Sequence, residues 1–127
     1  MEDTLSETRT PQETRTPQET QALAELLRSH NGVDVLVLDL RQMDTWTDFF
    51  VISTATSNTH LDGLERHIKS FCSERDIEII RRSRKPDGED EWRIIDLGST
   101  VVHLMSRRTR EFYDLERLYS MALTISN

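Results

Sequence analysis

The sequence predicts a mixed α/β (α+β) domain in which helices flank a five-stranded mixed sheet with one parallel crossover and hairpins. Three observations lead to this fold class. Short apolar runs rich in Val, Ile and Leu recur along the chain, amphipathic stretches of helical period separate them, and the 127 residues suffice for one hydrophobic core. Because 35% of the residues are hydrophobic and 31% are charged, we expect a modest core and a well-solvated surface.

The beginning of the chain repeats itself. The hexapeptide ETRTPQ fills residues 7–12 and again residues 13–18, and it contains no apolar residue that could build a core. We therefore expect residues 1–15 to be a disordered tail that carries the TRTPQE repeat. A single domain is expected over residues 16–122, followed by a C-terminal tail over residues 123–127.

The first helix has clear start and stop signals. Residues Thr16–Glu19 combine a capping-box pattern with proline at the first helical position. Apolar residues then recur at helical spacing until Asn31 and Gly32, which are typical of a helix end. Residues 33–40 (VDVLVLDL) and 49–55 (FFVISTA) are too short and too β-branched for helices, and they predict two buried strands.

The second helix is expected after Ser57, whose hydroxyl can cap it. Its apolar face consists of Leu61, Leu64, Ile68, Phe71 and Cys72. Residues 77–82 predict a third strand, so a strand, a helix and a strand follow one another as in a right-handed parallel crossover.

A turn is expected at Pro86–Gly88, and the strands of EWRIIDL (91–97) and TVVHLM (100–105) are expected to form an antiparallel hairpin through Gly98 and Ser99. A last helix from Ser106 or Arg107 to Ala122 would close the domain. Its inward side would carry Phe112, Leu115, Leu118 and Tyr119.

Catalytic chemistry finds little support in the sequence. Asp96 and His103 could form an acid–base pair, but no nucleophile motif accompanies them, so we favour a structural or recognition role. Cys72 lies on the apolar face of its helix and does not share that face with His67, which argues against a Cys–His nucleophile.

Metal and phosphate sites are likewise disfavoured, and we predict no cofactor and no metal. His60 and His67 are separated by about 10 Å of helical rise, too far to share an ion directly. The four glycines never cluster into a phosphate-binding loop.

The net charge of −7 disfavours a broad basic face for nucleic acid and suits a protein partner. Two local basic groups stand out. One covers Arg81–Lys85 and is followed by acids up to Glu91, so a solvated loop is favoured over an RNA contact. The other, Arg107–Arg110, opposes the dipole of the last helix, a conflict that sometimes marks a binding edge.

Trp92 is the most informative aromatic residue. If its strand alternates, Trp92 and Asp96 share one face, and His103 on the next strand lies between Val101 and Met105. Such a mixture of an indole, a carboxylate, an imidazole and apolar neighbours makes interface anchors. Equally, Trp92 could simply pack beneath a helix.

A cytoplasmic location is expected because the acidic start resembles neither a secretory signal nor a transit peptide. The lone Cys72 fits a reducing compartment. The longest apolar runs have four residues, so no membrane span is expected.

Four motifs in order, VDVLVLDL, TDFFVISTATSNTH, EWRIIDLGSTVVHLM and REFYDLERLY, resemble the ribosomal silencing factor family, also called RsfS or Iojap-like. The resemblance covers residues 22–120. It implies a nucleotidyltransferase-like fold without enzymatic activity.

The resemblance also implies what the protein binds. The family binds large-subunit ribosomal protein number fourteen on the 50S subunit, obstructs joining of the small subunit and represses translation under nutrient limitation. A peripheral contact with ribosomal RNA and a homodimer are both left open. A metal-dependent nucleotidyltransferase-like enzyme and an RNA-binding ribosome-assembly factor are the alternatives, but the Asp-x-Asp pair that a transferase needs for its metal is absent from the sequence.

The resemblance assigns roles to individual positions. The partner-binding residues would be Trp92, Asp96, Leu97, His103, Met105 and Glu116, and the structural anchors would be Asp48, Ser57, Tyr113 and Leu115. Ala55, Leu97, Ser99 and Tyr119 depart from the residues usual in the family. Two of these departures, Leu97 and Ser99, lie beside the expected contact with the ribosomal protein, so the sequence does not define the affinity of that contact.

Overall fold

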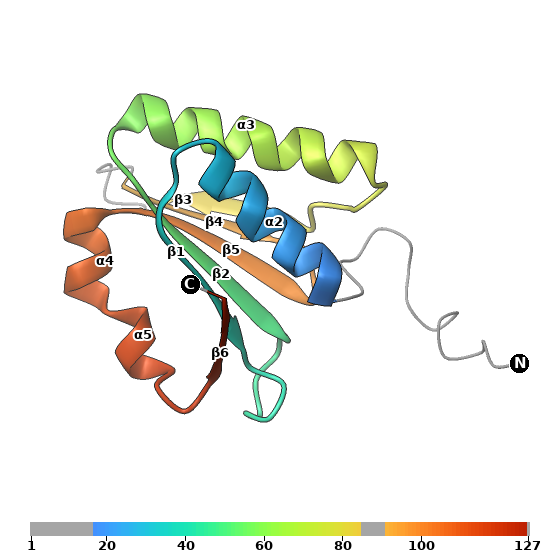
Figure 1. Ribbon diagram of the computed structural model, residues 1–127, viewed down its shortest axis with the longest axis vertical. Coiled ribbons are helices and arrows are strands. Elements are labelled where there is room, and N and C mark those ends of the chain that lie inside the picture. Colours follow the sequence, from blue (N-terminus) through green and yellow to red (C-terminus); the bar gives the residue numbers. More distant parts are fainter. Residues whose placement is uncertain (1–16, 85–90, 127) are drawn as a thin grey trace, which may run out of the picture.

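One mixed sheet of six strands organises the molecule, in the order β3-β4-β5-β2-β1-β6 (Figure 1). The computed structural model describes residues 17–84 and 91–126. Neighbouring strands are antiparallel except β2 and β5, which are parallel. The strands are β1 (Val33–Asp39), β2 (Phe49–Ala55), β3 (Arg81–Arg84), β4 (Trp92–Asp96), β5 (Thr100–Ser106) and β6 (Leu123–Ser126).

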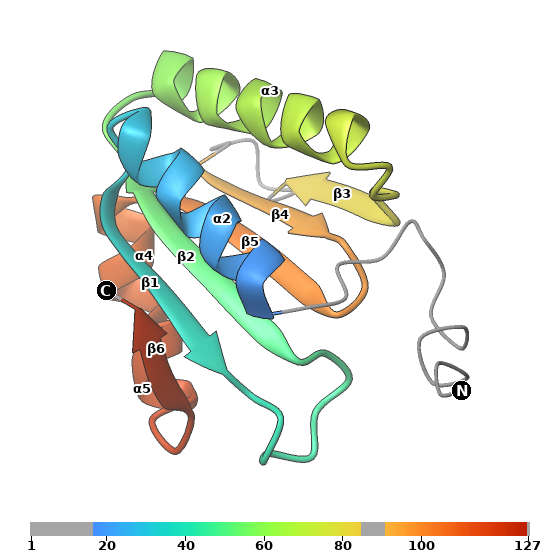
Figure 2. The same ribbon diagram turned by 45° about the vertical axis from the view of Figure 1, so that its right-hand side comes forward.

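Helices cover the two faces of the sheet unequally. The long helices α2 (Pro17–Ser29) and α3 (Asn58–Glu74) lie on one face, and the short helices α4 (Arg107–Tyr113) and α5 (Leu115–Leu118) lie on the other (Figure 2). No helix within the described ranges is long and apolar enough to cross a membrane.

Helix boundaries agree with the start and stop signals of the sequence. Helix α2 begins at Pro17, as predicted, and the backbone N–H of Gly32 closes its end by donating to the Leu27 carbonyl at 2.7 Å. Helix α3 is capped by Ser57, whose hydroxyl oxygen accepts the backbone N–H of His60 at 3.0 Å. These contacts satisfy backbone groups that helix ends would otherwise leave unpaired.

Apolar side chains form one core on each face of the sheet. The first core joins α2 and α3 to the sheet and includes the fully buried Leu23, Leu27, Ile68 and Ile95. The second lies beneath α4–α5 and includes Phe50, Ile52, Met105 and Leu115. Every residue of β2 is buried, because this strand lies between the two cores.

The mixed α/β class, the flanking helices and the four strands β1, β2, β4 and β5 are confirmed, but the third strand was misplaced. It runs over Arg81–Arg84 instead of residues 77–82, and Ile77 lies in the first core as the chain leaves α3. Because α3 carries the chain to the sheet edge, β3 pairs with β4, and the parallel neighbour of β2 is β5.

The end of the chain also differs from the prediction. Asp114 adopts a left-handed conformation with φ 49°, so α4 ends there and a single helix to Ala122 is wrong. Phe112 is 79% exposed and Leu118 is 70% exposed, so neither lies on an inward side as predicted. The predicted C-terminal tail supplies β6, the sixth strand.

Two sequence predictions fall outside the described residues. These are the disordered tail over residues 1–15 and the turn at Pro86–Gly88.

Two glycines provide a matched test of this packing. A Cβ at Gly32 would lie 2.5 Å from the Ser53 hydroxyl oxygen and 2.8 Å from the Leu27 carbonyl oxygen, so Gly32→Ala should lower the free energy of unfolding by about 1–3 kcal/mol. A Cβ at Gly63, inside α3, meets nothing closer than 3.8 Å, so Gly63→Ala should raise it by about 0.5–1 kcal/mol. Urea denaturation measures both, and equal effects would contradict the packing at Gly32.

Candidate partner-binding surface

Trp92 and His103 meet at one end of the sheet, as the alternation of the strands predicts. Trp92 is half-buried at the start of β4, and its indole Nε1–H donates to Nδ1 of His103 at 3.2 Å. The indole also contacts the ring of Tyr113, at 4.8 Å between centroids. Trp92 is therefore both a packing residue beneath α4 and a residue with accessible surface, so the two sequence interpretations are not exclusive.

His103 is held as a neutral imidazole. It is 5% exposed and lies edge-on to Phe50, with ring centroids 4.5 Å apart. Burial lowers the pKa of His103 to about 4. Because Nδ1 accepts the indole proton, the ring proton belongs on Nε2, and this buried atom has no hydrogen-bond partner within the described ranges. A neutral ring of this kind is suited to holding Trp92 in place.

Asp96 does not form an acid–base pair with His103 in the structure. Its carboxylate accepts the backbone N–H of Gly98 at 2.9 Å and lies 3.7 Å from the Arg81 guanidinium. The first contact closes the turn between β4 and β5, where Gly98 has φ 95°. Asp96 therefore shapes this hairpin, and it is 7% exposed.

Leu97 and Met105 occupy different positions from those expected of contact residues. Leu97 belongs to the first core, on the opposite face of the sheet from Trp92, because successive strand residues alternate between faces. Met105 pairs with Trp92 across β4 and β5 but is wholly buried in the second core. Neither side chain reaches the surface: Met105 packs beneath the face that carries Trp92, and Leu97 packs in the core of the other face.

Glu116 and the basic start of α4 are joined by one buried residue. The Arg110 guanidinium donates to the Glu116 carboxylate at 2.9 and 3.1 Å, to the Asp34 carbonyl at 2.7 Å and to the Thr54 hydroxyl at 3.0 Å. Arg110 is 9% exposed. It therefore fixes α4 and α5 to β1 and β2.

The other two arginines at the start of α4 also form ion pairs. Arg107 lies 3.4 Å from the Asp34 carboxylate, and Arg108 lies 2.6 Å from the Glu91 carboxylate. These partners account for the positive charge that seemed misplaced in the sequence. The three arginines Arg107, Arg108 and Arg110 thus form ion pairs within the domain, and their charges are not left free to bind an anionic partner.

The expected anchors lie in distinct parts of the fold. Leu115 is buried in the second core, and Tyr113 packs partly against it. The backbone of Asp48 precedes β2, where its N–H donates to the Ser99 carbonyl at 3.0 Å and its carbonyl accepts the Leu40 N–H at 2.7 Å. Ser57 caps α3, as described above.

Three apolar side chains of this region are exposed: Phe112 and Leu118, which the sequence pattern places on the inward side of the last helix, and Met121, which it does not single out. Phe112, Leu118 and Met121 are 79%, 70% and 82% exposed, and Phe112 stacks edge-on against Tyr113 with centroids 4.9 Å apart. We define the α4–α5 surface as Trp92, Phe112, Tyr113, Leu118 and Met121. Within this set the ring of Tyr113 contacts the rings of Trp92 and Phe112, and accessible aromatic side chains in contact are typical of a site that binds another macromolecule.

Metal and nucleophile chemistry gains no support from the geometry. The described ranges contain no group of three His, Cys, Asp or Glu side chains that could hold a metal ion. Cys72 is buried, and burial raises the pKa of its thiol to about 11, so the reactive thiolate is disfavoured at neutral pH.

The fold is that of a small mixed α/β domain with exposed apolar side chains on and beside α4 and α5. Comparison with known proteins assigns it to a family: the family model described as "Ribosomal silencing factor during starvation" (RsfS) matches residues 13–127. The chain belongs to the ribosomal silencing factor family, as its sequence motifs suggest.

Individual relatives agree with this assignment. The chain is 35% identical over 102 residues to ribosomal silencing factor RsfS of Treponema pallidum, covering 80% of this chain and 90% of that protein. It is 33% identical to the mouse protein named "Mitochondrial assembly of ribosomal large subunit protein 1", covering 78% of this chain and 44% of the mouse protein. A crystal structure of a Chromobacterium violaceum protein shares the fold, with a TM-score of 0.75 and 23% identity over 84% of this chain and 88% of that one.

The neutral, buried His103 predicts how stability depends on pH. In the unfolded chain the His103 imidazole takes up a proton near pH 6.5, but in the folded protein it does so only at about pH 4. The free energy of unfolding should therefore fall as the pH drops from 6.5 to 4. The difference amounts to about 3 kcal/mol. Urea denaturation between pH 7.5 and pH 4 measures the loss.

His103→Gln is the control for this measurement, because glutamine can accept the indole N–H but does not titrate. The variant should lose the part of the pH dependence that lies between the two pKa values. An unchanged slope in this variant would show that other groups cause it.

Proposed function

We propose that the protein binds the large ribosomal subunit at the face where the small subunit docks, and thereby represses translation when nutrients are limiting. Membership of the ribosomal silencing factor family supports a ribosomal partner. The name of the mouse relative connects that protein with the large subunit. The protein would act in the cytoplasm by occupying space on the subunit, without turnover.

The observation that carries the proposal is the α4–α5 surface. Its Trp, Tyr, Phe and Met side chains are of the types enriched in protein interfaces, and Trp and Tyr are among those that supply most of the binding free energy. His103 and Tyr113 hold the Trp92 indole, so little conformational entropy would be lost when a partner covers it. We infer that ribosomal protein number fourteen covers this surface.

Other predicted contact residues would lie at the margin of the interface. Glu116, whose side chain is 36% exposed, is accessible beside α4, and Asp96 is mostly enclosed by its own turn. A ribosomal RNA contact would be peripheral, because the net charge is −7. A second copy of this chain would compete for the same apolar surface, so a homodimer and the ribosome-bound state would exclude one another.

The first experiment is a sucrose gradient of purified bacterial small and large subunits under joining conditions, with and without excess protein. The protein should travel with the large subunit while joined ribosomes diminish. A protein that binds the large subunit without affecting joining would fit an assembly factor instead. No binding at all would contradict a ribosomal partner in that organism.

Trp92→Ala should weaken binding to the large subunit by about 2 kcal/mol or more, which is about 30-fold in the dissociation constant. The matched control is Trp46→Ala, since Trp46 is 68% exposed in the β1–β2 connection at the other end of the sheet. Co-sedimentation at increasing protein concentrations measures both.

Because Trp92 also packs against Tyr113, its replacement could perturb the fold. Phe112→Ala offers a second test with less packing to lose, since Phe112 is 79% exposed. Circular dichroism checks that each variant is folded. If folded Trp92→Ala and Phe112→Ala both bind like the wild type, the α4–α5 surface is not the interface.

A further inference from the structure

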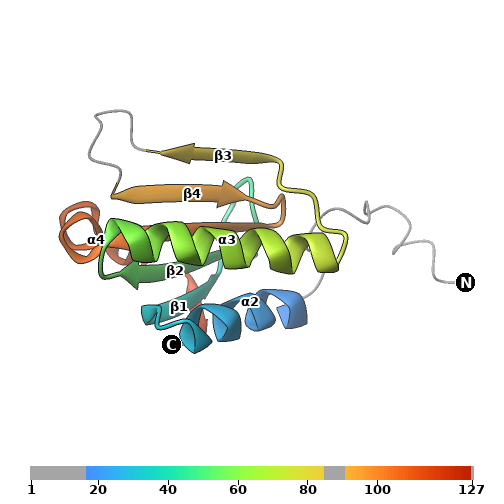
Figure 3. The same cartoon turned by 90° about the horizontal axis from the view of Figure 1, so that it is seen from above.

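The basic run that begins at Arg81 forms the edge strand of the sheet. Strand β3 pairs with β4 on one side, and no described segment pairs with its other side (Figure 3). An edge strand directs the N–H and C=O groups of alternate residues outward, where they can pair with an added strand. The neighbouring strand β4 carries Trp92 of the α4–α5 surface, but no residue of β3 belongs to that surface.

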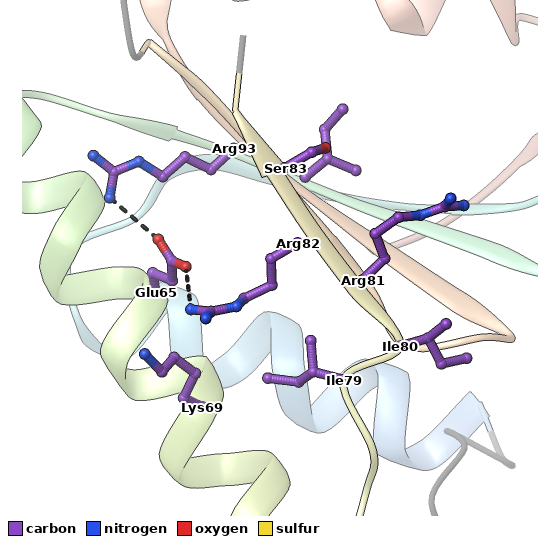
Figure 4. A pocket seen from close by; sticks show the side chains of 9 residues that line it. Glu65, Lys69, Ile79, Ile80, Arg81, Arg82, Ser83 and Arg93 are labelled. Carbon is purple, nitrogen blue, oxygen red and sulfur yellow. Dashed lines mark hydrogen bonds and ion pairs between the residues drawn. The ribbon is translucent and has the colours of Figure 1, made fainter. Parts of the chain in front are cut away.

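A groove of about 770 Å³ lies beside this edge, between β3 and α3 (Figure 4). Figure 4 shows Arg82 and Ile79 pointing toward α3, whereas Arg81 and Ile80 point to the other side of the strand. Ile80 is 49% exposed. A segment laid along β3 would therefore find apolar and basic side chains on both sides of its backbone.

The charges of the groove are unequal. Four basic side chains line it, against the single carboxylate of Glu65. That carboxylate is buried and already accepts hydrogen bonds from Arg82 at 3.0 Å and Arg93 at 3.2 Å. Its negative charge is thus compensated from within the chain.

Two of the cations are available to a ligand. Lys69 is exposed on α3 and forms no ion pair within the described part of the chain. The Arg81 side chain is 74% exposed and lies 3.7 Å from Asp96, a long contact at a solvated surface. In a chain of net charge −7, this is a local positive site that favours acidic ligands.

We propose that β3 binds an extended acidic peptide segment of a partner protein, which adds to the sheet as a further strand. Main-chain hydrogen bonds would supply affinity, and Lys69 and Arg81 would select glutamate or aspartate at positions on either side of the added strand. Ile79 and Ile80 would receive its apolar side chains.

Two other occupants fit the edge less well. A second copy adding through its own β3 would bring arginine side chains against arginine side chains, which is destabilising. Single-stranded RNA binds through stacking on aromatic side chains, and the residues that line the groove include none. RNA would also leave the outward backbone groups of β3 unused.

A fluorescein-labelled peptide of alternating glutamate and valine tests the proposal by fluorescence anisotropy. It should bind, whereas the corresponding lysine–valine peptide should not. A glutamate–valine peptide with alternate backbone nitrogens methylated keeps its charge but cannot pair with a strand edge, so it should bind at least about tenfold more weakly. In a ¹⁵N-labelled protein, the amide signals of Arg81–Arg84 should shift when the unmethylated peptide is added.

Lys69→Glu and Arg81→Glu should each weaken binding of the acidic peptide at least about tenfold, and the double variant should prefer the lysine–valine peptide. Arg117→Glu is the matched control, because it makes the same charge change at an exposed position of α5 and should bind the peptide like the wild type.

Several outcomes would overturn the proposal. These are equal binding of the methylated peptide, an equal loss in Arg117→Glu, and the absence of peptide binding. Binding of an RNA oligonucleotide through Lys69 and Arg81 in place of the peptide would also refute strand addition. The sucrose gradient separates this question from the proposed function, since Lys69→Glu should still travel with the large subunit.

Discussion

The parallel pairing of β2 with β5 is the constraint on which the rest of the structure depends. Seven register pairs, from Phe49 with Thr100 to Ala55 with Ser106, join two strands that are buried almost throughout. From the end of β2 the chain enters α3 on one face, and from the end of β5 it enters α4 on the other. The long helices close the first face. The short ones cover the second only in part, so Trp92 retains accessible surface, and Phe112 lies on the outward side of α4.

Two buried arginines hold the helices in these positions. Arg93 connects β4 to α3 through Asp62 at 2.6 Å and Glu65 at 3.2 Å, and Arg110 connects α4 to β1, β2 and Glu116. A buried guanidinium requires partners, because loss of one partner leaves an uncompensated charge in a medium of low polarity. The α4–α5 surface is thus fixed to the sheet by directional contacts as well as by apolar packing.

Local signals predicted what depends on local structure. Pro17, Gly32 and Ser57 mark helix ends through contacts with nearby backbone groups, and the alternation in β4 and β5 correctly brought Trp92 and His103 together. The sequence pattern gave wrong predictions where the structure of a segment depends on contacts with residues distant in the sequence. The β3 register depends on pairing with β4, β6 depends on β1, and the left-handed conformation of Asp114 ends α4 at Tyr113. Leu97 and Met105, which the resemblance assigns to the contact, are both buried, Leu97 in the first core and Met105 in the second.

The proposed interface and the β3 edge meet at a single element, β4. Its backbone pairs with β3, whereas the side chains of Trp92 and Ile94 face the second core. Binding at one site could alter affinity at the other only if β4 changed position. Strand β4 is held to β5 by five paired residues and to α3 by the buried Arg93. A shift of β4 would therefore break its contacts with both β5 and α3. The two sites should therefore bind independently, and a partner on β3 would be brought to the ribosome without weakening the hold on the subunit.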